Sequence, residues 1–119
     1  MHYIDVTEPS LDFISRNVAH WFLGQFLPDF KLDLSIIPLA LGSDDALGWT
    51  LQLNTDEYEI EINQTLSRKE YITTLLHELV HVWQHTQGYQ CEDEAYQMET
   101  ELCDQYMQEN LFLLNNGIY

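Results

Sequence analysis

Basic residues are scarce in this chain of 119 residues. Four Lys and Arg residues stand against twenty Asp and Glu, which gives a formal net charge of -16 at pH 7, and no basic residue follows Lys69. Contact with the phosphate backbone of a nucleic acid requires a basic surface. The composition therefore argues against direct binding of nucleic acid.

Long apolar runs and cysteine pairs are also missing. No window reaches the ~18 to 20 uncharged apolar residues of a membrane span, and the N-terminal stretch MHYIDVTEPS has no basic segment followed by an apolar one. These absences predict a cytoplasmic protein that does not bind membranes.

The two cysteines, Cys91 and Cys103, form no C-x-x-C pair. They predict neither a disulfide framework nor a zinc ribbon, and we expect both to be reduced and buried.

The proportion of apolar residues is high enough for the chain to fold. They make up 45% of the sequence, and aromatic residues make up 13%. A chain of this length forms one domain with a modest core. With no repeat, linker or low-complexity tract, residues 1–119 are expected to form a single domain.

Periodicity in the first half predicts a helix followed by three strands. The segment 7–27 has a Thr or Ser cap, an early Pro, and apolar residues at helical spacing (Leu11, Ile14, Val18, Phe22 and Phe26). Residues 30–40 alternate like a strand that stops near Pro38, and residues 48–63 alternate on both sides of 54–56 like a hairpin. We expect a small, three-stranded, mainly antiparallel sheet, in which Glu57, Glu59 and Glu61 form a solvated side.

Two helices are predicted in the second half. Ser67 and Glu70 have the spacing of a capping box, and the helix that they begin runs towards Gly88. A third helix is expected from about Cys91, with apolar residues from Ala95 to Leu113 near one face and an end before Gly117. The predicted fold class is therefore α+β, in the order helix, three strands, helix, helix.

The second of these three helices contains the pattern H-E-x-x-H, formed by His77, Glu78 and His81. Residues four apart lie one above the other on a helix, so the two imidazoles can converge on one metal ion. Glu78 is turned by about 100° from His77, which lets its carboxylate take a proton from a metal-bound water. With 5 His and 11 Glu in the chain, about 0.02 such matches are expected by chance. The pattern therefore points to chemistry at a metal.

The segment around this pattern resembles a known family. Residues 59–84, EIEINQTLSRKEYITTLLHELVHVWQ, are similar to the strand and helix at the core of the zincin metallopeptidases, in particular the small SprT-like and minigluzincin members. The likeness covers residues 30–105 and implies a minimal zincin domain. It further implies that His77 and His81 bind Zn²⁺, and that Glu78 is the general base for hydrolysis of a peptide or protein substrate by a zinc-activated water.

The H-E-x-x-H pattern does not contain the third zinc ligand. The later His of the SprT-like pattern and that of the metzincin pattern are both missing, and His85 is one helical turn too far along to join His77 and His81. By resemblance to the gluzincins, the ligand is a carboxylate on the following helix. Glu92 stands three residues before the small Ala95 and is the expected ligand, with Glu94 and Glu99 as alternatives.

Other roles for the chain and for its site remain open. One is a catalytically silent, zinc-binding interaction module, and another is an acidic inhibitor that imitates nucleic acid. The presence of Glu78 argues against the first, because metal binding alone does not require it, and a mimic needs no histidine motif.

Tyr89 or Tyr96 could donate a hydrogen bond to a tetrahedral oxyanion. An extended peptide could add to an edge strand of the sheet. The small size is compatible with a compact genome, such as that of a phage.

Overall fold

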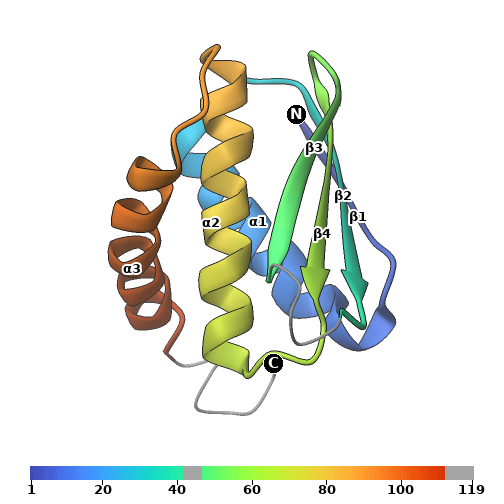
Figure 1. Ribbon diagram of the computed structural model, residues 1–119, viewed down its shortest axis with the longest axis vertical. Coiled ribbons are helices and arrows are strands. Elements are labelled where there is room, and N and C mark those ends of the chain that lie inside the picture. Colours follow the sequence, from blue (N-terminus) through green and yellow to red (C-terminus); the bar gives the residue numbers. More distant parts are fainter. Residues whose placement is uncertain (42–46, 112–119) are drawn as a thin grey trace.

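The protein has an α+β fold in which helices cover one face of a four-stranded sheet (Figure 1). The computed structural model describes residues 1–41 and 47–111. The helix α2 packs against the sheet, and α3 packs on the side of α2 that faces away from the sheet. The elements are β1 (His2–Val6), a 3₁₀ turn (Pro9–Leu11), α1 (Asp12–Phe26), β2 (Leu32–Leu39), β3 (Gly48–Asn54), β4 (Glu57–Asn63), α2 (Arg68–Thr86) and α3 (Glu92–Glu109).

The prediction of a three-stranded, mainly antiparallel sheet is wrong. The sheet has the strand order β1-β2-β4-β3, with β1 and β4 parallel to β2 and only β3 antiparallel to its neighbour β4. The strand β1 was not predicted because it is five residues long and buries only Ile4 and Val6. Its partner in the sheet is separated from it by α1, so local periodicity carries no sign of this parallel pairing.

The helices and the hairpin agree with the prediction, except for the Thr or Ser cap expected on the first helix. Helix α1 follows the 3₁₀ turn directly, and its N-cap residue, Leu11, makes no side-chain cap bond. The hairpin has its turn between Asn54 and Glu57, and the strand expected in residues 30–40 ends at Leu39, one residue after Pro38. The hydroxyl of Ser67 accepts a hydrogen bond from the backbone N–H of Glu70, which is one half of a capping box, and it donates one to the Glu70 carboxylate. The expected position of Leu113 and the helix end before Gly117 lie outside the described residues.

The helix α2 is covered on two sides, and this burial determines what its polar residues need. Twelve of its side chains are buried between the sheet, α1 and α3. Besides Thr74, four polar or charged side chains are among them, namely those of His77, Glu78, His81 and Gln84. A polar group removed from water is costly unless it finds a partner. The partners of these four side chains therefore define the site.

The prediction for the cysteines is correct in one case. Both thiols are free, and Cys103 is buried beside the hydroxyl of Thr73, but Cys91 is exposed. Cys91 immediately precedes α3, where the chain turns at the surface.

Within the described part of the chain, none of the helices combines the length and the apolar character that crossing a bilayer requires.

Candidate metal centre

The three residues of the H-E-x-x-H pattern lie together in the middle of α2. His77, Glu78 and His81 are 7%, 5% and 4% exposed, and the centroids of the two imidazole rings are 4.9 Å apart. The i, i+4 spacing places both rings on the side of α2 that faces α3. The helix thus presents two nitrogen donors to its neighbour.

Glu92, at the start of α3, supplies a third donor at the same point. Its Oε1 atom lies 2.9 Å from Nε2 of His77 and 2.6 Å from Nε2 of His81. One ligand atom from each of these three residues lies within 4.8 Å of the other two. Among the residues that the structure describes, this is the cluster of His and carboxylate side chains that could hold a metal ion.

The turn between α2 and α3 brings Glu92 level with His81. Helix α2 ends at Thr86, which is about 7.5 Å beyond His81 along the axis at 1.5 Å per residue. Gly88 then takes a left-handed conformation with φ of +89°, and its N–H donates to the carbonyl of His85. Because the non-helical link 87–91 advances farther per residue than a helix, α3 begins beside His81 and not beside the end of α2.

The other nitrogen of each imidazole faces a hydrogen-bond acceptor. Nδ1 of His77 lies 3.1 Å from Oε2 of Glu99, and Nδ1 of His81 lies 2.8 Å from Oε1 of Gln84. A neutral imidazole that donates from Nδ1 carries a lone pair on Nε2. When both imidazoles are in this form, two lone pairs and a carboxylate oxygen point at one another, which is unfavourable unless a cation lies among them. The donor set fits a divalent metal ion.

Three glutamates that the sequence left as alternatives occupy different positions. Glu92 faces both Nε2 atoms, whereas Glu99 contacts the far nitrogen of His77. Glu94 lies outside the cluster, and its carboxylate accepts hydrogen bonds from Tyr89 at 2.6 Å and Gln84 at 2.9 Å. These two bonds lower the pKa of Glu94, and the same contact raises the pKa of Tyr89 to about 12. Only Glu92 of the three is part of the cluster.

Glu78 lies on the side of α2 that faces the sheet. The hydroxyl of Thr50 on β3 donates to the Glu78 carboxylate at 2.8 Å and also lies 3.1 Å from the Glu78 carbonyl. Burial raises the pKa of Glu78, although the hydrogen bond from Thr50 and the two nearby histidines oppose this shift. A raised pKa suits a general base, because it brings the carboxylate closer to the pH at which it must work.

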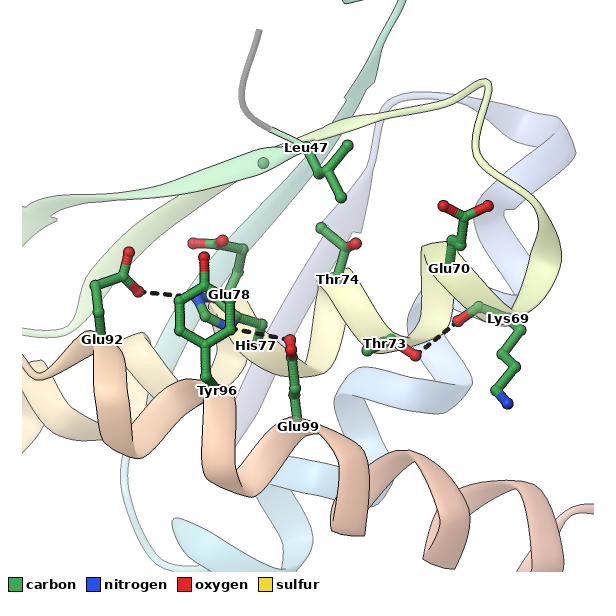
Figure 2. Close-up of a pocket in the computed structure, with 11 residues that line it drawn as sticks. Leu47, Lys69, Glu70, Thr73, Thr74, His77, Glu78, Glu92, Tyr96 and Glu99 are labelled. Carbon is green, nitrogen blue, oxygen red and sulfur yellow. Dashed lines mark hydrogen bonds and ion pairs between the residues drawn. The ribbon is translucent and has the colours of Figure 1, made fainter. Parts of the chain in front are cut away.

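A cleft opens beside this cluster (Figure 2). It has a volume of about 520 Å³ and lies between α2, α3 and the start of β3. Tyr96 stands at its edge, with its ring centroid 4.7 Å from that of His77. The lining residues are Leu47, Gly48, Lys69, Glu70, Thr73, Thr74, His77, Glu78, Glu92, Tyr96 and Glu99. A peptide-sized ligand can therefore reach His77, Glu78 and Glu92 from solvent.

Three residues that shape this site were not predicted from the sequence. Thr50 binds Glu78, and Gln84 binds His81. Gly48 allows β3 to approach α2 closely, because a Cβ atom there would lie 3.0 Å from the Glu61 carbonyl oxygen and 3.3 Å from the methyl group of Thr74. The position of Gln84, three residues after His81, is a local signal that could have been used. Nothing local signals the contact of Thr50, which depends on how β3 packs on α2.

The structure also gives the positions of His85, the two tyrosines and Glu61, for which the sequence suggested roles. His85 lies outside the cluster, with its Nε2 atom 3.0 Å from the side-chain oxygen of Gln90. The hydroxyl of Tyr89 is occupied by Glu94, so Tyr96 is the better placed of the two tyrosines considered for an oxyanion. Glu61 is not simply solvated, because it accepts a hydrogen bond from the indole N–H of Trp49.

Comparison with known proteins agrees with a metal-dependent site. Residues 42–110, more than half of the chain, match the model of a family described as "Putative metallopeptidase family (DUF6782)". The matched region includes the H-E-x-x-H pattern and Glu92. Comparison with curated proteins and with solved structures gave no match. The chain therefore belongs to this metallopeptidase family.

Proposed function

We propose that this protein is a zinc-dependent peptidase of the zincin type, with His77, His81 and Glu92 as metal ligands and Glu78 as general base. The observation that carries the proposal is the convergence of two imidazole Nε2 atoms on one carboxylate oxygen, at 2.9 and 2.6 Å, while both Nδ1 atoms face acceptors. The match to a metallopeptidase family supports the same function at a general level.

The donor set favours zinc among the common divalent metals. Two imidazole nitrogens and one carboxylate oxygen are typical of catalytic zinc sites, which keep a further position open. When bound, such an ion supplies a Lewis acid that polarises a carbonyl group and lowers the pKa of a water molecule. The acceptors behind the two imidazoles support the assignment, since histidines that bind a metal commonly donate their other N–H group to such a partner.

Glu78 has the properties that the general base needs. It is buried beside the proposed ligands, has a raised pKa, and is held in place by the hydroxyl of Thr50. In the proposed reaction, Glu78 accepts a proton from the attacking water and passes it to the leaving amine. Tyr96, which lines the cleft beside His77, is positioned to donate a hydrogen bond to the developing oxyanion.

The strand β3 is the proposed platform for the substrate. It forms one edge of the sheet, and Gly48 at its start lines the cleft together with the adjacent Leu47. The exposed edge of a strand has free backbone groups that can pair with an extended peptide. A peptide bound along β3 would pass beside Glu78, because Thr50 on the same strand contacts that residue.

The direct test is to measure bound metal and hydrolysis on the same purified protein. We expect about one zinc ion per chain by elemental analysis. We also expect cleavage of casein or of the protein itself that stops with a chelator and returns when zinc is added. Bound zinc without any cleavage would favour the interaction-module role. Absence of both zinc binding and cleavage would contradict the proposal and favour the acidic mimic.

The charge of the cleft predicts a preference for basic substrates. Besides Glu78 and Glu92, the cleft is lined by Glu70 and Glu99, and the whole chain carries a net charge of -16. Lys69 also lines the cleft, but Figure 2 shows its side chain extending in the opposite direction to that of Glu70. Clefts with one sign of charge attract ligands of the opposite sign, and salt weakens the attraction. We therefore expect peptides with Lys or Arg near the cleaved bond to be better substrates than matched peptides with Glu.

Glu70→Gln tests this preference. Gln is accepted at this position of a capping box, so the start of α2 is expected to stay intact. The ratio of kcat/KM for basic over acidic peptides should fall by about threefold at low salt, which is the scale of one exposed charge. Glu101→Gln is the matched control, because it makes the same change in net charge at an exposed position on α3 that does not line the cleft. An equal fall in both variants would assign the preference to the overall charge of the chain and contradict a role for Glu70.

A further inference from the structure

Gln84 is a fully buried side chain whose amide group uses all of its hydrogen-bonding capacity. Its Oε1 atom accepts from the backbone N–H of Cys91 at 3.1 Å and from Nδ1 of His81 at 2.8 Å. Its Nε2 atom donates to the backbone carbonyl of Cys91 and to the carboxylate of Glu94, both at 2.9 Å. The exposed fraction of Gln84 is 0%.

These four contacts determine the orientation of the amide. If the oxygen and nitrogen of Gln84 were exchanged, its NH₂ group would face the N–H of Cys91, and its oxygen would face the Cys91 carbonyl and the Glu94 carboxylate. All three contacts would then be repulsive, so the oxygen must be the atom that faces His81. His81 therefore carries a proton on Nδ1, and a neutral imidazole in this tautomer directs the lone pair of Nε2 towards Glu92.

The same amide also holds the start of α3. Cys91 is bound to Gln84 through both its N–H and its carbonyl, and it immediately precedes Glu92. The link from α2 to α3 is thereby attached to α2 one residue before the carboxylate that faces the histidines. One side chain thus acts on two members of the cluster, the ring of His81 and the backbone next to Glu92.

We propose that Gln84 is a positioning residue for the metal centre, which sets the tautomer of His81 and holds Glu92 against α2. This inference rests on the proposed metal-binding function, and it adds a role for a residue outside the H-E-x-x-H pattern and the proposed ligands. The inference requires the effect of Gln84 on the metal centre to come from its side-chain oxygen, which faces His81, and not only from the volume that the side chain fills in the core.

Two substitutions separate these effects. Gln84→Met keeps a similar volume and removes all four hydrogen bonds. Gln84→Glu keeps an oxygen that can accept from His81 and from the N–H of Cys91. Its second oxygen loses both donated bonds and is repelled by the Cys91 carbonyl and the Glu94 carboxylate. Gln97→Met, at an exposed position on α3, is the control for the same change of residue type. For each protein, zinc affinity is measured by competition with a chelating dye, and the Nδ1–H proton of His81 is followed by NMR in the zinc-loaded state.

In Gln84→Met, zinc affinity should fall by about 10- to 100-fold, the usual effect of removing a partner of a metal-bound histidine. The Nδ1–H proton of His81 should also exchange rapidly with water. In Gln84→Glu, the proton should remain protected and affinity should fall less than in Gln84→Met. The loss of two donated bonds and the repulsion at the second oxygen lower the stability of the metal-free protein. Gln97→Met should match the parent.

Two results would overturn the inference. One is parent-like affinity and proton protection in a folded Gln84→Met. The other is a rapidly exchanging Nδ1–H proton of His81 in a folded Gln84→Glu, where an acceptor still faces that nitrogen. If Gln84→Met does not fold, Gln84→Glu decides by itself, because a missing or rapidly exchanging Nδ1–H proton there contradicts the role. Failure of the parent to bind zinc would be a failure of the proposed function and is detected before any variant is made.

Discussion

Glu78→Gln is expected to abolish peptide hydrolysis while leaving the metal bound. A positioned general base contributes roughly 10²- to 10⁴-fold to a rate, and an amide cannot accept the proton. The change in shape is small, and the hydroxyl of Thr50 can donate to the amide oxygen as it does to the carboxylate. The measurement is kcat/KM on a peptide substrate together with the zinc content of the same sample. Turnover at the parent rate would show that Glu78 has a structural role only.

The same variant carries a test on stability. Burial raises the pKa of Glu78 in the folded state, so the folded protein favours the neutral carboxyl group. This contribution to stability is present below the ordinary pKa of Glu and is lost as the pH rises through the raised value. In the metal-free protein, Glu78→Gln should therefore be more stable than the parent at pH 8, and the difference should shrink at pH 4. Urea unfolding at the two pH values measures it. A variant that is less stable at pH 8 would contradict the buried, unfavourable charge.

Loss of a proposed ligand is expected to have the second large effect. His77→Ala or His81→Ala should remove zinc binding at micromolar zinc, because only two of the three donors remain. A ligand that binds only the folded state stabilises it, by about 2.7 kcal/mol at a concentration 100 times its Kd. The rise in the melting temperature of the parent on adding zinc should therefore be absent in both variants. Full zinc occupancy in either one would contradict the site.

The three glutamates of α3 provide a matched series for the third ligand. Glu92→Gln, Glu94→Gln and Glu99→Gln make the same change in net charge, so the general field of an acidic surface is held constant. Only Glu92 faces both Nε2 atoms, and its replacement should weaken zinc affinity tenfold or more. Glu94 lies outside the cluster, and Gln in place of Glu99 can still accept a bond from His77, so both should have small effects. Equal small losses in all three would mean that the third ligand is water or another residue.

Much of the site follows from short-range patterns in the sequence. His77, Glu78 and His81 lie on one helix, where a spacing of four residues determines which side chains share a face. The capping box at Ser67 and Glu70 and the hairpin around Asn54 are equally local, and each could be read without knowing what the segment packs against. These features need only the geometry of a single helix or turn.

The tertiary structure decided which partners these residues have. Three glutamates within eight residues of α3 cannot be ranked until the link after Gly88 determines where that helix begins beside α2. The contact of Thr50 with Glu78 exists because β3 approaches α2 over Gly48, and the parallel pairing of β1 with β2 depends on the path of the chain through α1.

Gln84 shows the division between the two levels most clearly. The sequence alone shows that Gln84 stands three residues after His81. Two of its four hydrogen bonds, however, are to the backbone of Cys91 and a third is to Glu94. Spacing along a helix determines which residues can face the same way. Only the packing of α3 on α2 determines what they meet there, because those contacts join segments whose relative position no local pattern encodes.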